Sequence, residues 1–178
     1  MKKSCSFEDF LICGNPVNPK RIILFEKKWC FEKAVRCLNN FHQNLLVCSL
    51  GVPSNKCLNF IRKFEKKKAF YFGDMDPESI YTFLTFLFLK RRPSPKNKVK
   101  WTVKFGGLTL SDYKKYLKSK DNILIKLSNS EKDILEYIKD FKLQNLKREL
   151  QFLIRNNVKI EIEAINSYGF DNYLKDKV

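Results

Sequence analysis

Residues 69–77, Ala-Phe-Tyr-Phe-Gly-Asp-Met-Asp-Pro, decide the fold of this chain. The apolar run 69–72 predicts a fully buried strand, and residues 73–77 predict the turn that follows it. Pro77 suits the first position of a helix, so we expect a helix over residues 78–89. A buried strand, a tight turn and a helix in this order form one unit of an open α/β sheet.

Two similar units precede this stretch. Residues 21–25, Arg-Ile-Ile-Leu-Phe, predict a strand that leads through Glu26 into a helix over residues 28–39. Residues 45–49 predict a second strand, which a Gly-Val-Pro-Ser turn over 51–54 joins to an amphipathic helix carrying Leu58, Phe60, Ile61 and Phe64. Three such units in a row predict an α/β fold with a mainly parallel sheet and helices on both faces.

The sequence changes character after residue 89. Residues 90–100 contain two prolines among basic residues and predict a loop, while 101–105 predict a fourth strand. We expect helices over 111–118, 130–141 and 143–156, with Ser130 as an N-cap, and either helix or a short strand over the alternating residues 158–164. The chain therefore divides into a lead-in (1–19), an α/β core (20–108) and a small helical C-terminal extension packed on that core (109–178).

The charge of the chain points to a polyanionic partner. Thirty-five Lys and Arg residues against 19 Asp and Glu give a net charge of +16 in a chain of 178 residues. Such a surplus favours nucleic acid, although a general lysine bias of the source proteome is the alternative explanation. The N-terminus is a poor signal peptide, and the apolar run 80–89 is about half the length of a membrane-spanning helix. We therefore expect a cytoplasmic protein with no membrane partner.

The cysteine and histidine content argues against a structural zinc site. The six cysteines form no C-x-x-C pair, and His42 is the only histidine. Tetrahedral zinc sites need closely spaced Cys or His ligands, so we expect the cysteines to be small buried hydrophobes in a reducing compartment. His42 is predicted to be an ordinary surface residue.

Acidic residues follow two of the predicted strands directly. Glu26 ends the first strand, and Asp74 and Asp76 follow the third. Ligands of open parallel sheets bind at the carboxyl ends of the strands, so these three carboxylates can form one site. Hard cations such as Mg²⁺ prefer oxygen ligands, and their usual chemistry is phosphoryl transfer. The alternatives are a solvated helix start at Glu26 and a merely capped turn at Asp-x-Asp-Pro.

Three motifs in this order resemble a known family. Residues 25–27 (Phe-Glu-Lys), 51–54 (Gly-Val-Pro-Ser) and 72–77 (Phe-Gly-Asp-Met-Asp-Pro) resemble the TOPRIM motifs of the topoisomerase VI A subunit. They also resemble those of its meiotic double-strand-break relatives and of the toprim nuclease subunit of Wadjet plasmid defence. The resemblance implies a Rossmann-like TOPRIM fold in which Glu26, Asp74 and Asp76 bind Mg²⁺, with Mn²⁺ as a substitute.

The C-terminal part of the sequence extends the resemblance. Residues 127–131, 146–150 and 158–164 are similar to the helical C-terminal segment of those proteins. A glutamate near the C-terminal end is recurrent in the family, and it matches Glu163 or, less closely, Glu161. The resemblance thus implies Glu163 as a further metal ligand.

The sequence departs from this family in two respects. The topoisomerase VI relatives attack DNA with a tyrosine on a winged-helix domain, and the 20 residues before Arg21 cannot encode such a domain. We therefore expect no covalent strand transfer by this chain alone, and we expect Tyr71 and Tyr81 to be core or rim residues. Ser79 stands where many relatives have a glycine-containing turn.

These observations predict a Mg²⁺-dependent DNA nuclease or nickase with Glu26, Asp74 and Asp76 as catalytic residues. It could serve a defence or recombination complex, with a protein partner or a second copy completing the DNA surface. The alternatives are a non-catalytic DNA-binding subunit whose acids hold a structural ion, and an RNA-processing nuclease. The predicted phosphate contacts are Lys27, Lys90, Arg91, Arg92, Lys96, Lys98, Lys100 and Lys104. For the stretch from Lys90 to Lys104, the alternative is a solvated loop without contact to DNA.

Overall fold

The computed structural model of the chain describes residues 5–7, 9–38, 41–99, 101–117 and 123–177. Its main feature is a six-stranded sheet with the strand order β1-β2-β4-β3-β5-β6. Strands β4, β3, β5 and β6 run parallel, and β1 and β2 extend the sheet in antiparallel pairing. The strands are β1 (Cys5–Phe7), β2 (Phe10–Gly14), β3 (Ile22–Phe25), β4 (Leu45–Cys48), β5 (Ala69–Phe72) and β6 (Val103–Phe105).

The three predicted strand–helix units are present. Strand β3 leads into α1 (Lys28–Cys37), β4 into α2 (Asn55–Arg62) and β5 into α3 (Pro77–Phe88). Pro77 is the first residue of α3, as predicted, because its missing N–H has no partner to lose there. Helix α1 ends at Cys37, and Asn39 of the predicted helix lies outside the described residues.

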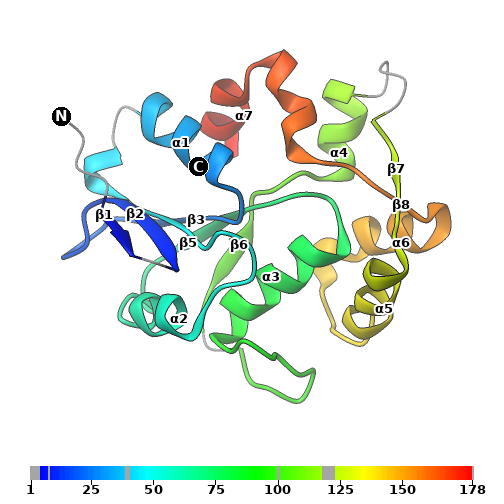
Figure 1. Ribbon diagram of the computed structural model, residues 1–178, viewed down its shortest axis with the longest axis horizontal. Helices are drawn as coiled ribbons and strands as arrows, with labels where there is room; N and C mark the ends of the chain where they lie inside the picture. Colours follow the sequence, from blue (N-terminus) through cyan, green and yellow to red (C-terminus); the bar gives the residue numbers. More distant parts are fainter. Residues whose placement is uncertain (1–4, 8, 39–40, 100, 118–122, 178) are drawn as a thin grey trace.

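Helices cover both faces of the sheet (Figure 1), so the predicted α/β fold is confirmed. Alternate residues of a strand point to opposite faces, and Ile22 and Leu24 belong to the core beneath α2 and α3. Ile23 and Phe25 belong to the second core, beneath α1 and α7 (Phe170–Lys177). Because both faces are covered, β3 and β4 are apolar throughout and completely buried, and β5 is buried except at Phe70.

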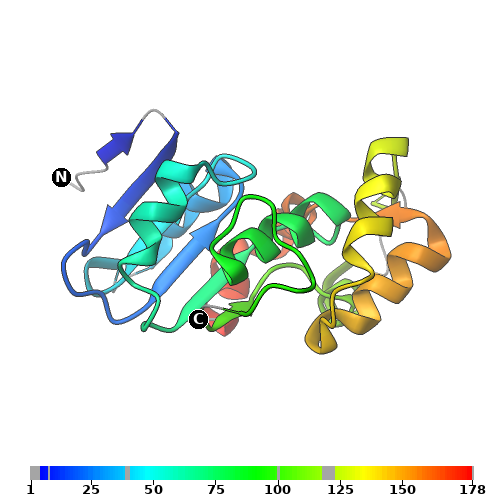
Figure 2. The same cartoon turned by 90° about the horizontal axis from the view of Figure 1, so that it is seen from below.

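The C-terminal part contains the expected helices with different boundaries. The elements are α4 (Leu110–Asp112), a π-helical turn (Tyr113–Leu117), β7 (Ile125–Lys126), α5 (Asn129–Ile138), a 3₁₀ turn (Gln144–Leu146), α6 (Lys147–Asn156), β8 (Val158–Lys159) and a 3₁₀ helix, η4 (Ile162–Tyr168). Helices α5 and α6 and the β7–β8 ribbon lie at the end of the molecule remote from β1 and β2 (Figure 2). Lys118 lies outside the described residues.

The prediction of Ser130 as an N-cap was wrong. Ser128 caps α5, because its hydroxyl accepts a bond from the Glu131 N–H while the Glu131 carboxylate accepts one from the Ser128 N–H. This reciprocal capping box needs Ser and Glu three residues apart, a spacing that only Ser128 has. The N-cap of α5 therefore lies two residues before the predicted one, and the helix begins at Asn129 instead of residue 130.

Residues 158–164 are neither one strand nor one helix. Val158 and Lys159 pair with β7, and Ile160 then exchanges two backbone hydrogen bonds with Met75, in the turn after β5. The chain turns into η4 at Ile162. This segment, which lies far from residues 74–76 in the sequence, consequently forms one wall of the turn that carries both aspartates.

Strand β2 was not predicted from the sequence. Residues 10–14, Phe-Leu-Ile-Cys-Gly, pair antiparallel with β4 on one side and with β1, the edge strand, on the other. The predicted strand over 101–105 begins only at Val103, because Trp101 packs in the core and its indole N–H donates to the Lys67 carbonyl. Among the described residues, no helix is long and apolar enough to cross a bilayer.

Candidate acidic metal centre

Parallel pairing of β3 with β5 brings two of the three motifs together. Phe25 and Phe72 are register partners, and the Glu26 N–H donates to the Phe72 carbonyl at 3.3 Å. Glu26 therefore leaves the sheet beside the turn that begins at Gly73. This edge is the carboxyl end of the strands, where open α/β sheets bind their ligands.

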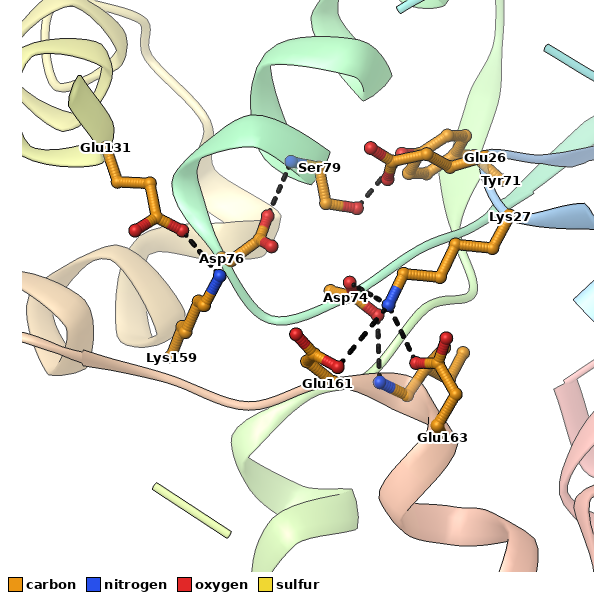
Figure 3. Close-up of polar contacts among 11 residues, drawn as sticks. Glu26, Lys27, Tyr71, Asp74, Asp76, Ser79, Glu131, Lys159, Glu161 and Glu163 are labelled. Atoms are coloured by element: carbon orange, nitrogen blue, oxygen red, sulfur yellow. Dashed lines mark hydrogen bonds and ion pairs between the residues drawn. The ribbon is translucent and has the colours of Figure 1, made fainter. Parts of the chain in front are cut away.

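The Glu26 carboxylate is held by two hydroxyl-bearing residues (Figure 3). The Tyr71 hydroxyl donates to Glu26 Oε2 at 2.8 Å and lies 3.0 Å from the Ser79 hydroxyl. Tyr71 and Ser79 are both fully buried, so this pair fixes the position of the carboxylate from inside the core. Ser79 is thus part of the support of Glu26.

Gly73 makes this arrangement sterically possible. A Cβ atom at residue 73 would overlap Ser79 Oγ and would lie 2.6 Å from the Tyr71 hydroxyl. Both atoms belong to buried side chains that cannot move without breaking their contacts with Glu26. The glycine before the aspartates is therefore required by close packing around the first motif.

Gly73→Ala is expected to destabilise the protein by about 1–3 kcal/mol, as overpacking of a filled core does, and to release Glu26 from its hydroxyl partners. Urea denaturation measures the first effect. Gly106→Ala is the matched control, because its Cβ would lie 3.1 Å from the edge of the Phe72 ring, which demands only a small shift. Equal stability of Gly73→Ala and the wild type would contradict this packing argument.

Asp74 and Asp76 are buried and point to different neighbours. Asp74 is 4% exposed, and its Oδ1 accepts a hydrogen bond from the Ile162 N–H at 2.8 Å. Asp76 is 5% exposed, and its Oδ1 accepts from the Ser79 N–H at 2.6 Å, which caps α3. Capping occupies only one oxygen of Asp76, so the capped turn and the acidic site are compatible.

Lys27 lies among the acids. Its ammonium group is 2.8 Å from Asp74 Oδ2, 2.7 Å from Glu163 Oε2 and 3.8 Å from Glu161 Oε2 (Figure 3). The bridge between Met75 and Ile160 carries both glutamates to this place. The structure therefore puts Glu163 beside Asp74 and puts Lys27 inside the acidic cluster.

The carboxylates destabilise one another's charged forms. Burial raises the pKa of Asp76 well above its usual range, and the charges of Asp74 and Glu26 raise it further. Burial raises the pKa of Asp74 to about 6 although Lys27 opposes this shift, and burial also raises the pKa of Glu26. Burial lowers the pKa of Lys27, but Asp74 and Glu163 more than offset this and raise it. A cation at this place would relieve the repulsion.

The donor set fits a hard divalent cation. Every side chain concerned offers carboxylate oxygens, which Mg²⁺ and Mn²⁺ accept, and the cluster carries more negative than positive charge. Within the described part of the chain, however, no three Asp, Glu, His or Cys side chains converge on one point as a ready-made metal site. The structure brings Glu26, Asp74 and Asp76 to one edge of the sheet without joining them at one centre.

The predicted phosphate contacts lie in three environments. Arg91 and Arg92 are exposed beside Tyr81, and Arg92 lines the same cavity as Glu26. Lys90, Lys96, Lys98 and Lys104 are exposed, and Lys100 lies outside the described residues. Lys27 is about one-quarter exposed within the acidic cluster. Their contact with nucleic acid stays a prediction.

Two supporting contacts have no signal in the local sequence. The bond between Tyr71 and Glu26 joins residues 45 positions apart, and Lys159 pairs with Glu131 at 2.8 Å close to the second aspartate. The spacing of Asp76 and Ser79 is a capping pattern that the sequence does contain. Long-range pairs of this kind follow only from the packing of the C-terminal part on the turn after β5.

Comparison with known proteins agrees with the fold. The family model for the Toprim domain of the topoisomerase 6 A subunit and Spo11 matches residues 21–178. A search of curated proteins gives no match. The matched residues include all the acidic side chains described above, from Glu26 to Glu163.

Proposed function

This chain belongs to the TOPRIM-domain family of the topoisomerase VI A subunit and Spo11, and from that premise we propose that it is a Mg²⁺-dependent DNA nuclease or nickase. TOPRIM domains in general bind divalent metal ions, most often Mg²⁺. The observation that carries the proposal is a glutamate fixed by Tyr71 and Ser79 beside two buried aspartates. A positioned base next to a cation-binding cluster is the arrangement that phosphodiester hydrolysis needs.

Asp74, Asp76 and Glu163 are the residues that would hold the ion. When bound, Mg²⁺ or Mn²⁺ would polarise the scissile phosphate and offset the charge that develops on the leaving oxygen. Glu26 accepts a proton from the attacking water. The water oxygen forms a bond to phosphorus, and the ester bond between phosphorus and the leaving oxygen breaks. Burial raises the pKa of Glu26 and so makes it a stronger base than an exposed glutamate.

Water is a better candidate nucleophile than the tyrosines near the site. Tyr71 is completely buried, and its hydroxyl is engaged with Glu26 and Ser79. The Tyr81 hydroxyl donates to the Arg91 carbonyl at 3.0 Å. Neither hydroxyl is presented to a phosphate, which supports hydrolysis rather than a covalent protein–DNA intermediate.

Supercoiled plasmid incubated with the protein and Mg²⁺ or Mn²⁺ tests the proposal. We expect nicked or linear DNA, no reaction with EDTA, and no protein attached to the DNA on a denaturing gel. Tyr81→Phe should retain activity. A covalent adduct that disappears when either Tyr71 or Tyr81 is replaced would overturn hydrolysis in favour of transesterification.

The basic loop after α3 is proposed to contact the DNA backbone. Replacing Lys90, Lys96 and Lys98 with Gln should weaken binding equally for unrelated DNA sequences, because phosphates carry no sequence information. The slope of log affinity against log salt should fall by about 0.9 for each phosphate contact removed. Gln at the exposed Lys63, Lys66 and Lys132 is the control of equal charge. Equal slopes for the loop variant and the wild type would contradict this role.

A non-catalytic DNA-binding subunit is the second candidate, and the position of Lys27 favours it. Its ammonium group contacts Asp74 and Glu163, so part of the acidic charge is neutralised by the chain itself. In that case the protein would bind DNA within a defence or recombination complex and leave cleavage to a partner. Metal-dependent DNA binding without any strand cleavage, in a preparation that binds Mg²⁺, would favour this alternative.

A further inference from the structure

A cavity of about 680 Å³ opens beside Glu26. The turn after β4, helix α3 and helix α5 line this open cavity, with Val52, Tyr81 and Tyr137 among the lining residues. Helices α3 and α5 pack against each other, and both views show them side by side (Figures 1 and 2). Its volume lies within the range of sites that hold small organic ligands.

The wall of this cavity is mainly apolar and aromatic. The rings of Tyr81 and Tyr137 lie with their centroids 6.0 Å apart and are tilted by 54°. Their hydroxyls donate to the carbonyls of Arg91 and Pro93, so both rings are fixed in place. Val52 is 43% exposed and Tyr137 is 42% exposed, an unusual amount for large apolar side chains gathered at one place.

Charged groups of opposite sign lie on different parts of this apolar wall. Arg91 and Arg92 line a second hollow of about 510 Å³ that shares Val52, Tyr81 and Arg92 with the first. Guanidinium groups bind phosphates, whereas the carboxylates of Glu78 and Asp133 in the first cavity repel them and accept hydrogen bonds from amino groups. The site thus suits a flat ring with amino or imino donors, joined to phosphates outside the cavity.

We propose that this cavity binds an unpaired base of the DNA strand whose backbone meets the acidic centre. The inference rests on the proposed function, because Glu26 forms part of the same wall. In a duplex both faces of a base are covered by its neighbours, so the ring can stack on Tyr81 or Tyr137 only where the strand is single or locally unpaired. The substrate class is therefore single-stranded or partly unpaired DNA.

Fluorescence anisotropy with two labelled strands tests this proposal. One is a strand of about 12 nucleotides, and the other is a strand of abasic sugar phosphates with the same length and charge; both are titrated in EDTA, so that cleavage plays no part. Base stacking on an aromatic ring strengthens binding by about 5-fold to 150-fold. We expect this preference for the natural strand in the wild type, its loss in Tyr137→Ala and its retention in Tyr137→Phe, which keeps the ring.

Equal affinity of the wild type for both strands, or binding of neither, would overturn the proposal. So would loss of the preference in Tyr137→Phe, because the effect would then come from the hydroxyl that holds the loop at Pro93 and not from stacking. A base preference in a protein that cuts no DNA with Mg²⁺ would leave the cavity assignment in place and refute hydrolysis. Cleavage of DNA by a protein that shows no base preference would support hydrolysis and refute the cavity assignment.

Discussion

Glu26→Gln is expected to lower the rate of DNA cleavage by about 10²–10⁴-fold, the usual contribution of a positioned general base. The amide keeps the shape of the carboxylate and can still accept the Tyr71 hydrogen bond, but it takes up no proton at neutral pH. The salt dependence of DNA binding should change little, since the proposed phosphate contacts lie on other residues. The nicking rate of supercoiled plasmid under single-turnover conditions measures the effect.

Glu32→Gln is the matched control for this variant. Glu32 lies in α1, is 48% exposed and makes an ion pair with Lys28 at 3.7 Å, so its replacement removes the same charge away from the site. It should cleave like the wild type. A Glu26→Gln protein that cleaves as fast as Glu32→Gln would remove Glu26 from the mechanism.

Asp76→Asn is expected to raise the melting temperature of the metal-free protein and to abolish its further increase with Mg²⁺. Burial and the charges of Asp74 and Glu26 oppose ionisation of Asp76, whereas Asn is uncharged and still caps α3 well. Each kcal/mol shifts the melting temperature of a domain of this size by about 2–4 °C. The wild type should gain about 2.7 kcal/mol when the metal is present at about 100 times its dissociation constant.

The dependence of stability on pH provides a second readout for the aspartates. The pKa of Asp74 is raised from 3.8 to about 6 in the folded protein, so the folded state holds this proton more tightly than the unfolded state. The stabilisation of the folded protein by this proton is therefore greatest below pH about 4, and it is lost as the pH rises to about 6. Denaturation of the metal-free wild type and Asp74→Asn should diverge across this window; parallel curves would contradict the raised pKa.

Much of the fold follows from local sequence, and the exceptions have physical reasons. Buried parallel strands need unbroken apolar runs, and residues 22–25, 45–48 and 69–72 supply them. Pro77 marks the start of α3. Strand β2 is not followed by a helix, unlike β3, β4 and β5, so the repeating strand–helix pattern did not identify it. The segment after Lys159 changes from strand to 3₁₀ helix because it pairs with Met75, a tertiary contact that overrides its alternating pattern.

The acidic residues of the candidate site have clearer signals in the sequence than the side chains that contact them. Strand ends and motif spacing identify Glu26, Asp74 and Asp76, and family resemblance adds Glu163. The structure revealed the hydroxyls of Tyr71 and Ser79 on Glu26, and it placed Lys27 between Asp74 and Glu163. Such contacts depend on which side chains share a buried space, and no local pattern in the sequence encodes this.

Calorimetric titration of Mg²⁺ into the wild type, Asp74→Asn and Asp140→Asn tests directly whether the acidic cluster is a cation site. Asp140 is exposed at the end of α5, so its replacement removes one negative charge without touching the cluster. We predict equal Mg²⁺ affinities for the wild type and Asp140→Asn, and a loss of more than about tenfold in Asp74→Asn. Replacing even a residue that only orients a metal ligand lowers metal affinity by about tenfold or more. Equal affinities in all three proteins, or no binding by the wild type, would contradict the assignment.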